Sequence, residues 1–251
     1  MLEVKNLRVS KNGYDLVKNV SFSVSAGDWL MIAGPNGAGK STMVRAIAQT
    51  LQSTGEITVS GKNARKLGAG ELARELGVLS QYNYVGYPFT VEEVVSLGRY
   101  AYSKGFFAGN DGGDGLMVKR ALELTGLTAL SGRSAMTLSG GALHRTFLAQ
   151  LIAQDPRVMI LDEPTNHLDL IYQKQIFGLM RGWLKTPGRA VISVVHDLSL
   201  AKAYGSRALL LKDGETLSIG GADEVLSPEN LQNAYSMDVY GWMESMYSQW
   251  K

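Results

Sequence analysis

The stretch GPNGAGKST, Gly34 to Thr42, follows the apolar run WLMIA and precedes MVRAIAQTL, whose residues suit a helix. Its pattern is Gly-x-x-x-x-Gly-Lys-Ser, and a strand before it with a helix after it is the context in which the pattern forms a phosphate-binding loop. The spacing, the flanking elements and the Lys-Ser pair all agree, which disfavours an ordinary glycine-rich turn that caps a helix. The stretch therefore predicts a nucleoside triphosphate site.

Each residue type in this loop has a physical task. Its three glycines permit backbone angles that a β-carbon disfavours, so successive amides can turn inward around phosphate oxygens. The helix that starts near Lys40 adds the positive end of its dipole. Lys40 is predicted to reach the β- and γ-phosphates, and the Ser41 hydroxyl to bind the Mg²⁺ that accompanies ATP. The predicted nucleotide-binding residues of the loop are Gly34, Pro35, Asn36, Gly37, Ala38, Gly39, Lys40, Ser41 and Thr42.

Composition limits the classes of protein that fit around this site. The 251 residues are 45% hydrophobic and 19% charged, which is ordinary for a globular chain with a sizeable core. Lys and Arg number 25 against 23 Asp and Glu, without a long basic run, so no nucleic acid partner is expected. The absence of cysteine excludes disulfides and thiolate metal sites. The N-terminus alternates like a strand, and no apolar run approaches the roughly 18 residues of a membrane span.

Short apolar runs and amphipathic segments divide the chain. Strands are predicted at 3–10, 17–24, 29–33, 55–61, 76–81, 158–163, 190–197 and 207–214. Helices are predicted at 43–51, 90–102, 117–127, 141–154, 168–184 and 198–205. Late strands that alternate with helices indicate a parallel sheet with covering helices, interrupted by a helical block. The predicted divisions are 1–81 and 157–224 for the nucleotide-binding core, 82–156 for a helical subdomain and 225–251 for a C-terminal helical segment.

The segment GNDGGDG at 109–115 could suggest a calcium loop through Asp111 and Asp114. The spacing of these residues is not that of a calcium loop, and no following glutamate stands at the required distance. A flexible surface connection is therefore predicted, without a metal ion.

The segment VMILDEPTNHLDL, Val158 to Leu170, carries the next chemical signal. Four apolar residues place Asp162 at the carboxyl end of a buried strand, the edge of an α/β sheet where ligands bind. Asp162 is predicted to hold Mg²⁺ through its water shell. Glu163 follows at once and is predicted to act near the γ-phosphate, where a carboxylate can position and deprotonate the attacking water.

With these motifs and LSGG at Leu138 to Gly141, the sequence resembles the ATP-binding cassette (ABC) family over nearly its whole length. The resemblance implies an α/β fold: a P-loop NTPase core with a mixed, largely parallel sheet, an N-terminal antiparallel β portion and an inserted helical subdomain. It implies ATP hydrolysis with Mg²⁺. It also implies that Ser139, Gly140 and Gly141 present a serine and backbone amides to ATP held by a second copy of the chain, which gives a head-to-tail dimer with two composite sites.

Three further positions match the family pattern. Gln81 matches the glutamine that touches Mg²⁺ and the attacking water and signals to the helical block. His196 matches the histidine that contacts the γ-phosphate and supports the transition state. The run from Asn166 to Asp169 matches the loop that crosses the dimer interface, so His167 is expected to be structural or interfacial and not a metal ligand. The implied catalytic residues are Glu163, His196 and Gln81, and the implied metal site comprises Ser41, Gln81 and Asp162.

Two departures from the family pattern concern dimer affinity and the adenine base. Ala142 follows LSGG where a Gln or Glu is usual, so the polar contact of that side chain across the dimer is missing. The aromatic residue that stacks on adenine is also displaced, because Lys11 stands at its place and Tyr14 follows three residues later. Two roles remain open for Tyr14: stacking on adenine, or packing on its own neighbours.

The segment TVEEVVSLGRYAY, the wording EPTNHLDL and a single cassette without membrane helices resemble the importers of ferric siderophores, haem and cobalamin. The resemblance implies a peripheral subunit at the cytoplasmic face of the membrane, docked on permease subunits and served indirectly by an extracytoplasmic binding protein. The alternative is a non-transport ABC ATPase of the translation or DNA-repair type, which would need a second cassette or a coiled coil. Neither a repeat nor heptads are visible.

Two aromatic groups complete the pattern. The residues Tyr82, Tyr84, Tyr87, Phe89, Tyr100, Tyr102, Phe106 and Phe107 crowd the segment after Gln81, and are predicted to form a groove for a short permease helix. The residues Val239, Trp242, Met243, Met246, Tyr247 and Trp250 recur at helical spacing near the C-terminus. These C-terminal residues favour a helix packed on its own core, with a dimer contact or a membrane-surface contact as the alternative.

Overall fold

The computed structural model of the chain describes residues 1–102, 112–166 and 168–250. Its central element is a six-stranded sheet in the order β10-β9-β3-β8-β7-β6. Five of these strands run parallel, and only β10 is antiparallel to its neighbour β9. The strands are β3 (Trp29–Ala33), β6 (Leu76–Leu79), β7 (Val158–Asp162), β8 (Ala190–Val194), β9 (Arg207–Lys212) and β10 (Glu215–Gly221). The prediction of a mixed, largely parallel sheet is confirmed.

A second sheet is built from the N-terminal part of the chain and is antiparallel throughout. Its strand order is β2-β1-β4-β5. The strands are β1 (Leu2–Lys11), β2 (Tyr14–Val24), β4 (Thr54–Val59) and β5 (Lys62–Asn63). This sheet is the antiparallel β portion that the sequence predicted.

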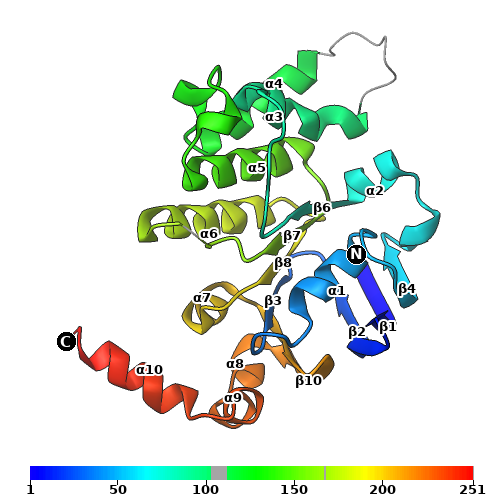
Figure 1. Cartoon of the computed structure of the whole chain (residues 1–251), viewed down its shortest axis with the longest axis vertical. Coiled ribbons are helices and arrows are strands. Elements are labelled where there is room, and N and C mark those ends of the chain that lie inside the picture. The colour runs from blue at the N-terminus through cyan, green and yellow to red at the C-terminus, as the bar shows by residue number, and fades with distance from the viewer. Residues whose placement is uncertain (103–111, 167, 251) are drawn as a thin grey trace.

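The two faces of the central sheet bury two separate apolar clusters, because side chains alternate between the faces of a strand. On β3, Leu30 and Ile32 belong to the cluster shared with the antiparallel sheet and α1 (Lys40–Ile47). Met31 belongs to the cluster shared with the helices of the other face, among them α6 (Leu170–Leu184) and α7 (Leu198–Tyr204). These layers fix the carboxyl ends of the parallel strands along one edge, where β3 leads into the phosphate loop (Figure 1).

The helical block forms one end of the molecule, with α3, α4 and α5 stacked together (Figure 1). Its elements are α3 (Val91–Ser96), the 3₁₀ segment η2 (Leu97–Tyr102), α4 (Gly112–Leu124), the 3₁₀ turns η3 (Thr128–Leu130) and η4 (Ala135–Thr137), and α5 (Gly140–Gln154). A short helix that the sequence did not suggest, α2 (Ala69–Glu75), precedes β6, and the 3₁₀ turn η1 (Ala64–Lys66) precedes α2. The helix predicted at 90–102 changes to 3₁₀ form after Ser96, where a β-carbon on Gly98 would overlap the Gln150 carbonyl of α5.

The glycine-rich segment 109–115 is in part helical, contrary to the predicted connection. Residues 112–115 form the first turn of α4, while 109–111 lie outside the described residues. Asp114 in this turn pairs with Arg99 at 2.7 Å, and an acidic side chain in a first turn also favours the helix dipole. The sequence suggested a loop because glycine disfavours helices, and the Arg99 contact offsets that preference.

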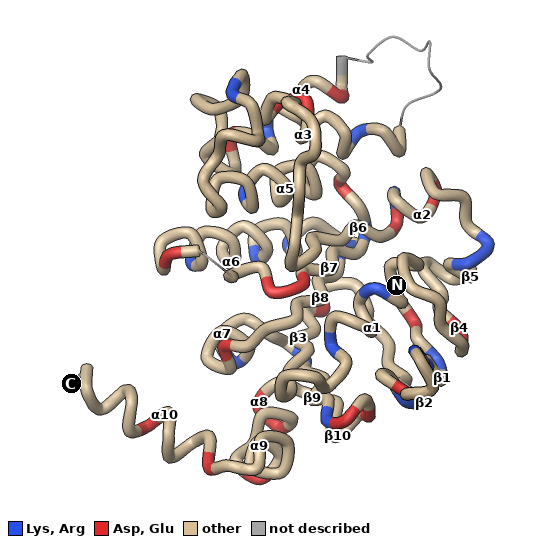
Figure 2. Tube along the Cα trace, in the orientation of Figure 1, with Lys and Arg blue, Asp and Glu red and all other residues tan. Residues whose placement is uncertain are grey.

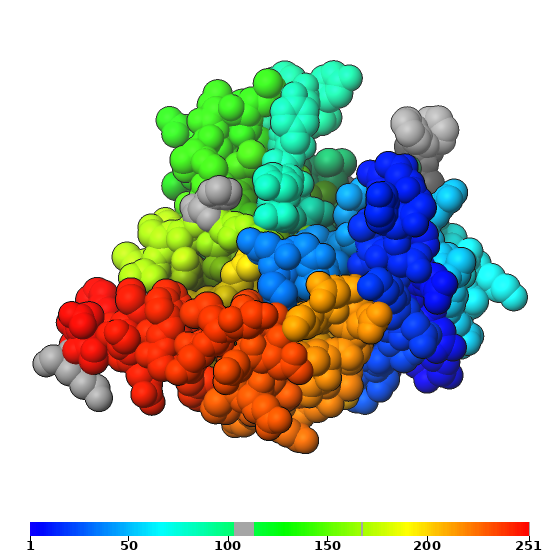
Figure 3. Space-filling model, turned by 60° about the horizontal axis from the view of Figure 1, so that its bottom comes forward, coloured from blue at the N-terminus to red at the C-terminus, as the bar shows by residue number. Residues whose placement is uncertain are grey.

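The C-terminal part comprises α8 (Ala222–Val225), α9 (Pro228–Tyr235) and α10 (Val239–Ser248), at the opposite end from α3 and α4 (Figure 1). The expectation that α10 packs on its own core holds only for its first half, where Val239, Tyr240 and Met243 join the main apolar cluster. Val239 is its one fully buried residue, and Trp242 is 56% and Trp250 89% exposed. The helix contacts the body through a few groups, including Tyr240, and forms a ridge along one rim of the surface (Figure 3). An exposed face therefore remains on α10.

Lys and Arg positions are interleaved with Asp and Glu positions along the chain, while acidic residues gather where β7 ends (Figure 2). Within residues 1–102, 112–166 and 168–250, no helix is both long and apolar enough to cross a membrane.

Candidate functional site

The phosphate loop between β3 and α1 has the backbone that its glycines allow. Gly34, Gly37 and Gly39 have φ values of 143°, 83° and 94°. A β-carbon on Gly34 would overlap the carbonyl oxygen of Leu211, and one on Gly39 would overlap that of Leu16. The loop is therefore held between β9 and β2, and only glycine fits at these two contacts.

Lys40 lies within this loop. It is buried, and its ammonium donates to the carbonyl of Gly34 at 2.7 Å and to that of Pro35 at 2.9 Å. Burial lowers the pKa of Lys40, while the negative charges of Glu163 and Asp162 act in the opposite direction. The ammonium is thus bonded to the first two carbonyls of the loop, and phosphate oxygens can take the place of these acceptors.

Ser41 and Asp162 meet although 121 residues separate them. The Ser41 hydroxyl donates to Asp162 Oδ1 at 3.0 Å, and Asp162 is buried at the end of β7. Burial raises the pKa of Asp162, and the Ser41 bond only partly offsets this. A hydroxyl beside a buried carboxylate is the oxygen donor set that suits Mg²⁺, and a cation there would offset the cost of burying the charge. The residues present therefore fit the metal ion.

Glu163 is the point on which the other polar groups converge. Its Oε2 accepts from Gln81 Nε2 at 2.8 Å and also from the side-chain amide of Asn166. Its Oε1 lies 2.7 Å from His196 Nε2. Gln81 and His196 follow the neighbouring strands β6 and β8, so the parallel sheet itself brings the three side chains together.

The backbone of Glu163 is also unusual. Its φ is +55°, in the left-handed region that non-glycine residues seldom occupy, and its amide donates to the Val194 carbonyl at 3.1 Å. This bond to β8 holds the sharp turn after β7. The Glu163 carboxylate is buried, whereas His196 is partly open to solvent. His196 therefore lies on the solvent side of the pair and the carboxylate on the inner side.

Gln81 was predicted to bind the metal ion with Ser41 and Asp162. The structure places Gln81 next to these two residues, without a hydrogen bond to either. Gln81 lines a hollow of about 490 Å³ together with both of these residues. Its amide nitrogen is turned to Glu163. The geometry therefore joins Gln81 to the carboxylate more closely than to the Ser41–Asp162 pair.

Ser139 caps the helix of its own chain, as its residue type allows. Its Oγ accepts from the Ala142 amide at 3.4 Å, and Ser139 and Gly140 are exposed. Ala142 itself is buried beneath them. The start of α5 lies against the loop that follows β7, because His144 Nε2 is 3.0 Å from the Pro164 carbonyl. The motif is thus at the surface beside the Glu163 turn, and His167 lies outside the described residues.

Tyr14 is 75% exposed at the start of β2, so the alternative that it packs on its neighbours does not hold. The same strand carries Leu16, whose carbonyl lies against Gly39. The Tyr14 ring is therefore free near the phosphate loop, and its contact with adenine remains a prediction.

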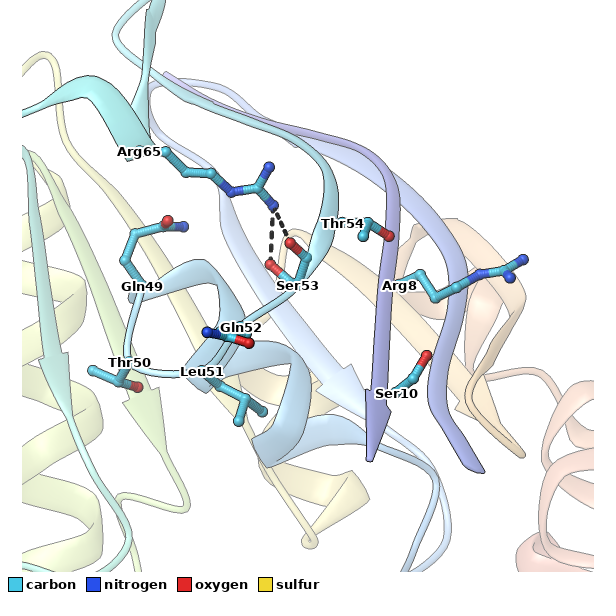
Figure 4. Close-up of a pocket in the computed structure, with 9 residues that line it drawn as sticks. All are labelled: Arg8, Ser10, Gln49, Thr50, Leu51, Gln52, Ser53, Thr54 and Arg65. Atoms are coloured by element: carbon cyan, nitrogen blue, oxygen red, sulfur yellow. Dashed lines mark hydrogen bonds between the residues drawn. The ribbon is translucent and has the colours of Figure 1, made fainter. Parts of the chain in front are cut away.

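A different hollow, of about 590 Å³, lies beside the connection from α1 to β4 and contains no residue of the phosphate loop. The side chain of Arg65 in it donates to the carbonyl and hydroxyl of Ser53 at 2.7 and 3.1 Å (Figure 4). Arg65 is thus engaged with Ser53, and the lining of the hollow includes neither Lys40 nor Glu163.

The model of the ABC transporter family matches residues 17–166, which include the phosphate loop, Asp162 and Glu163. The chain belongs to the ABC transporter family. It is an ATPase, which binds ATP together with Mg²⁺.

Relatives of this ABC ATPase cover most of its length. The iron(3+)-hydroxamate import ATP-binding protein FhuC of Bacillus subtilis is 32% identical over 94% of this chain and 88% of its own. The ABC transporter ATP-binding protein YvrA of the same organism is 36% identical over 89% of this chain, which spans about half (51%) of that protein. The ATP-binding cassette MJ0796, solved as a dimer with ADP and Pi, superposes with a TM-score of 0.79 at 26% identity over 88% of this chain and 99% of its own.

The contact of Asn166 with Glu163 was not predicted for this ABC ATPase. Asn166 had been assigned only to a loop at the dimer interface. The sequence signal for this contact is the short separation, because Asn166 stands three residues after Glu163 and a side chain can reach back over that distance in a turn.

The crowding at Gly34 leads to a stability prediction. Gly34→Ala should lower the free energy of unfolding by about 2–4 kcal/mol, because the new methyl group meets the backbone of β9 at an unfavourable φ. Gly37→Ala is the matched control, since its φ is also positive but nothing lies within 4 Å of the new methyl group. It should cost about 1–2 kcal/mol. Urea unfolding of both variants measures the difference, and equal losses would contradict the close contact with Leu211.

Proposed function

We propose that the chain is the ATP-hydrolysing subunit of an importer, which dimerises head-to-tail on ATP and drives uptake through separate permease subunits. The cargo class we propose is an iron-siderophore, haem or cobalamin-type complex. The observation that carries the proposal is the convergence of Gln81 and His196 on the carboxylate of Glu163, beside the Ser41–Asp162 pair. The import direction is supported by the similarity to FhuC, whose name states iron(3+)-hydroxamate import.

In this proposal the phosphate loop and Lys40 hold the triphosphate of ATP. Lys40 exchanges its bonds to the Gly34 and Pro35 carbonyls for bonds to β- and γ-phosphate oxygens. Ser41 and Asp162 hold Mg²⁺, which when bound neutralises charge on the phosphate oxygens. The dipole of α1 adds to the same stabilisation.

Glu163 is the proposed general base. A water molecule attacks the γ-phosphorus, its proton passes to the Glu163 carboxylate, and the bond to the β-phosphate oxygen breaks to release ADP and phosphate. Gln81 and His196 already touch this carboxylate, so they can orient the same water and the transferring phosphoryl group. The low exposure of Glu163 keeps the carboxylate in place while the partly exposed His196 faces the incoming nucleotide.

The second copy of the chain supplies Ser139, Gly140 and Gly141 in this proposal. The residues Ser139 and Gly140 are exposed, and the amides at the start of α5 point out of the helix as at any N-terminus. The Glu163 turn touches the start of α5 through His144 and Pro164. Assembly of the dimer and the hydrolytic carboxylate are thereby linked within one chain.

The docking surface for the permease is proposed on the helical subdomain at the aromatic group after Gln81. Tyr84 is 83% exposed, and Tyr82, Tyr87 and Tyr100 are also exposed. A hollow of about 550 Å³ lies between α2 and η2, with Arg74 and Leu97 in its lining together with Tyr100. The residues Phe106 and Phe107 of the predicted group lie outside the described residues. Tyr100 is the ring of the aromatic group that lines this hollow, and a short partner helix suits a hollow beside exposed rings.

Gln81 stands between this surface and the site, because it precedes Tyr82 directly and donates to Glu163. In this proposal ATP in the site displaces or reorients Gln81, and the aromatic segment follows Gln81 directly in sequence. We therefore propose that docking places the chain at the cytoplasmic face of the membrane as a peripheral subunit. A binding protein outside the cell would act on the permease and not on this chain.

The experiment replaces Tyr84 and Tyr87 with glutamate in one chain. Because both rings are largely exposed to solvent, their replacement should not disturb the fold. Basal ATP hydrolysis by the isolated variant should therefore stay within about twofold of the unmodified rate. Co-purification with the two permease subunits, and uptake of labelled ferric hydroxamate by cells that carry the complete transporter, should be lost, since a buried unpaired charge costs an interface several kcal/mol. Uptake and co-purification are measured on the same strains.

The matched control is Trp250→Glu, which places the same charge on another exposed aromatic residue away from the aromatic segment. It should leave co-purification and uptake unchanged. Intact permease binding by the Tyr84→Glu, Tyr87→Glu chain would place docking elsewhere on the helical subdomain. A chain that binds permease but shows no ATP-dependent uptake of ferric hydroxamate, haem or cobalamin would contradict the proposed cargo class.

A further inference from the structure

The first peptide of the phosphate loop has a contact that comes from the far end of the chain. The amide of Gly34 donates to the hydroxyl of Tyr235 at 3.2 Å, across 201 residues of sequence. Gly34 is buried, and its carbonyl accepts from Lys40. The carbonyl of Leu211 blocks its remaining side. The residue that opens the loop is thus held from three directions.

Tyr235 is well placed to hold this amide, because its own position is fixed. It is the last residue of α9, whose Leu231 and Ala234 are buried in the core. Lys212 at the end of β9 donates to the Asn233 carbonyl at 2.7 Å, which ties α9 to the strand that crowds Gly34. Burial raises the pKa of the Tyr235 phenol, so the hydroxyl stays neutral at physiological pH.

We propose that Tyr235 is a positioning residue for the phosphate loop, whose hydroxyl keeps the peptide before Gly34 in the orientation that binds ATP. The inference rests on the proposed role of the loop in nucleotide binding. It assigns to α9 a part in ATP affinity that the loop motif does not contain. Tyr235 itself does not touch the reacting atoms.

The physical reason is pre-organisation. Without the hydroxyl the Gly34 amide loses its acceptor in a buried place, which is unfavourable. The free loop can relieve this by rotating the peptide and opening toward water, so only a fraction of the molecules keep the competent shape. The apparent dissociation constant of ATP rises by the inverse of that fraction. The groups around Glu163 are not part of this change, so the turnover of bound ATP should persist.

The test is Tyr235→Phe, which keeps the ring and its packing but removes the acceptor. Titration with a fluorescent ATP analogue should show about three- to tenfold weaker binding, which corresponds to a competent fraction of about a third to a tenth. Steady-state hydrolysis should show the same rise in KM with kcat within about twofold, because the hydrolytic groups are unchanged. A purely structural role would instead reduce kcat through loss of active protein.

The matched control is Tyr240→Phe in the same C-terminal segment. The Tyr240 hydroxyl donates to the Leu226 carbonyl at 2.9 Å and accepts from Lys202 at 2.7 Å, without reaching the loop. Its removal should lower the melting temperature and leave the affinity for the ATP analogue unchanged. If Tyr240→Phe weakens binding as much as Tyr235→Phe, general loosening of the segment explains the effect and the inference is wrong.

Two further outcomes separate this inference from the proposed function. If the unmodified chain binds the ATP analogue no better than Lys40→Ala does, the proposed role of the loop is overturned. Unmodified chain that binds it with the same affinity as Tyr235→Phe would overturn the role of Tyr235 alone.

Discussion

Glu163→Gln should bind ATP as the unmodified chain does and hydrolyse it about a hundred to ten thousand times more slowly, the range that a positioned general base contributes. The substitution keeps the size of the side chain and an oxygen for the bonds from Gln81 and Asn166. It removes the group that accepts the proton of the attacking water. A steady-state phosphate-release assay measures the rate, and equilibrium binding of a fluorescent ATP analogue measures the affinity.

The control for this prediction is Glu244→Gln, which makes the same chemical change on an exposed residue of α10. It should hydrolyse ATP at the unmodified rate. Lys40→Ala should differ from Glu163→Gln in kind, since it should weaken ATP binding itself through the loss of the charge inside the loop. If Glu163→Gln releases phosphate as fast as the unmodified chain, another group is the base and the convergence on Glu163 serves a structural purpose.

The sequence predicted the elements that depend on local patterns. A five-residue apolar strand, three glycines and a Lys-Ser pair define the phosphate loop in one stretch, and the structure has that loop between β3 and α1. Four apolar residues before Asp162 likewise predicted the end of a buried strand, and β7 ends there. Such features need only neighbouring residues to fix them.

The geometry around Glu163 could not be read from any one segment. Gln81 and His196 reach the carboxylate because β6 and β8 both flank β7, and strand order is a property of the whole sheet. The family resemblance named these residues but not their contacts. The hydrogen bond between Gly34 and Tyr235 could not be predicted from the sequence either. A tyrosine at the end of a C-terminal helix has no local pattern that indicates its partner.

The expectations for α10 and for residues 109–115, which hold at most in part, fail for the same reason. The apolar residues of α10 show helical spacing, but spacing does not tell which surface covers them, and the helix leaves Trp242 and Trp250 exposed. Glycines at 112–115 indicated a connection, but the bond from Arg99 to Asp114 holds them in α4. In neither case does the local pattern tell whether another part of the chain lies against the segment.

A mixture of two inactive chains should regain hydrolysis if ATP is held between the phosphate loop of one copy and the LSGG motif of the other. Lys40→Ala disables the loop. Ser139→Arg places a bulky charge at the exposed start of α5, and loss of one such donor costs about a hundredfold or more in rate. The two lesions lie on separate elements, α1 and the cap of α5, so each chain keeps the half that the other lacks.

Random pairing of equal amounts makes half of the dimers mixed, and each mixed dimer has one intact site of two. The mixture should therefore show about a quarter of the unmodified rate, in a head-to-tail assembly whose two sites act independently. The control replaces the Ser139→Arg chain with one that carries both substitutions, since no pairing with Lys40→Ala then restores a site. A mixture that stays at the rate of its two parents, with subunit exchange verified by fluorescence transfer, would show that Ser139 and Lys40 serve ATP within one chain or not at all. A rate near one quarter would instead require that the serine of LSGG act across the interface, because no single chain in the mixture contains both residues.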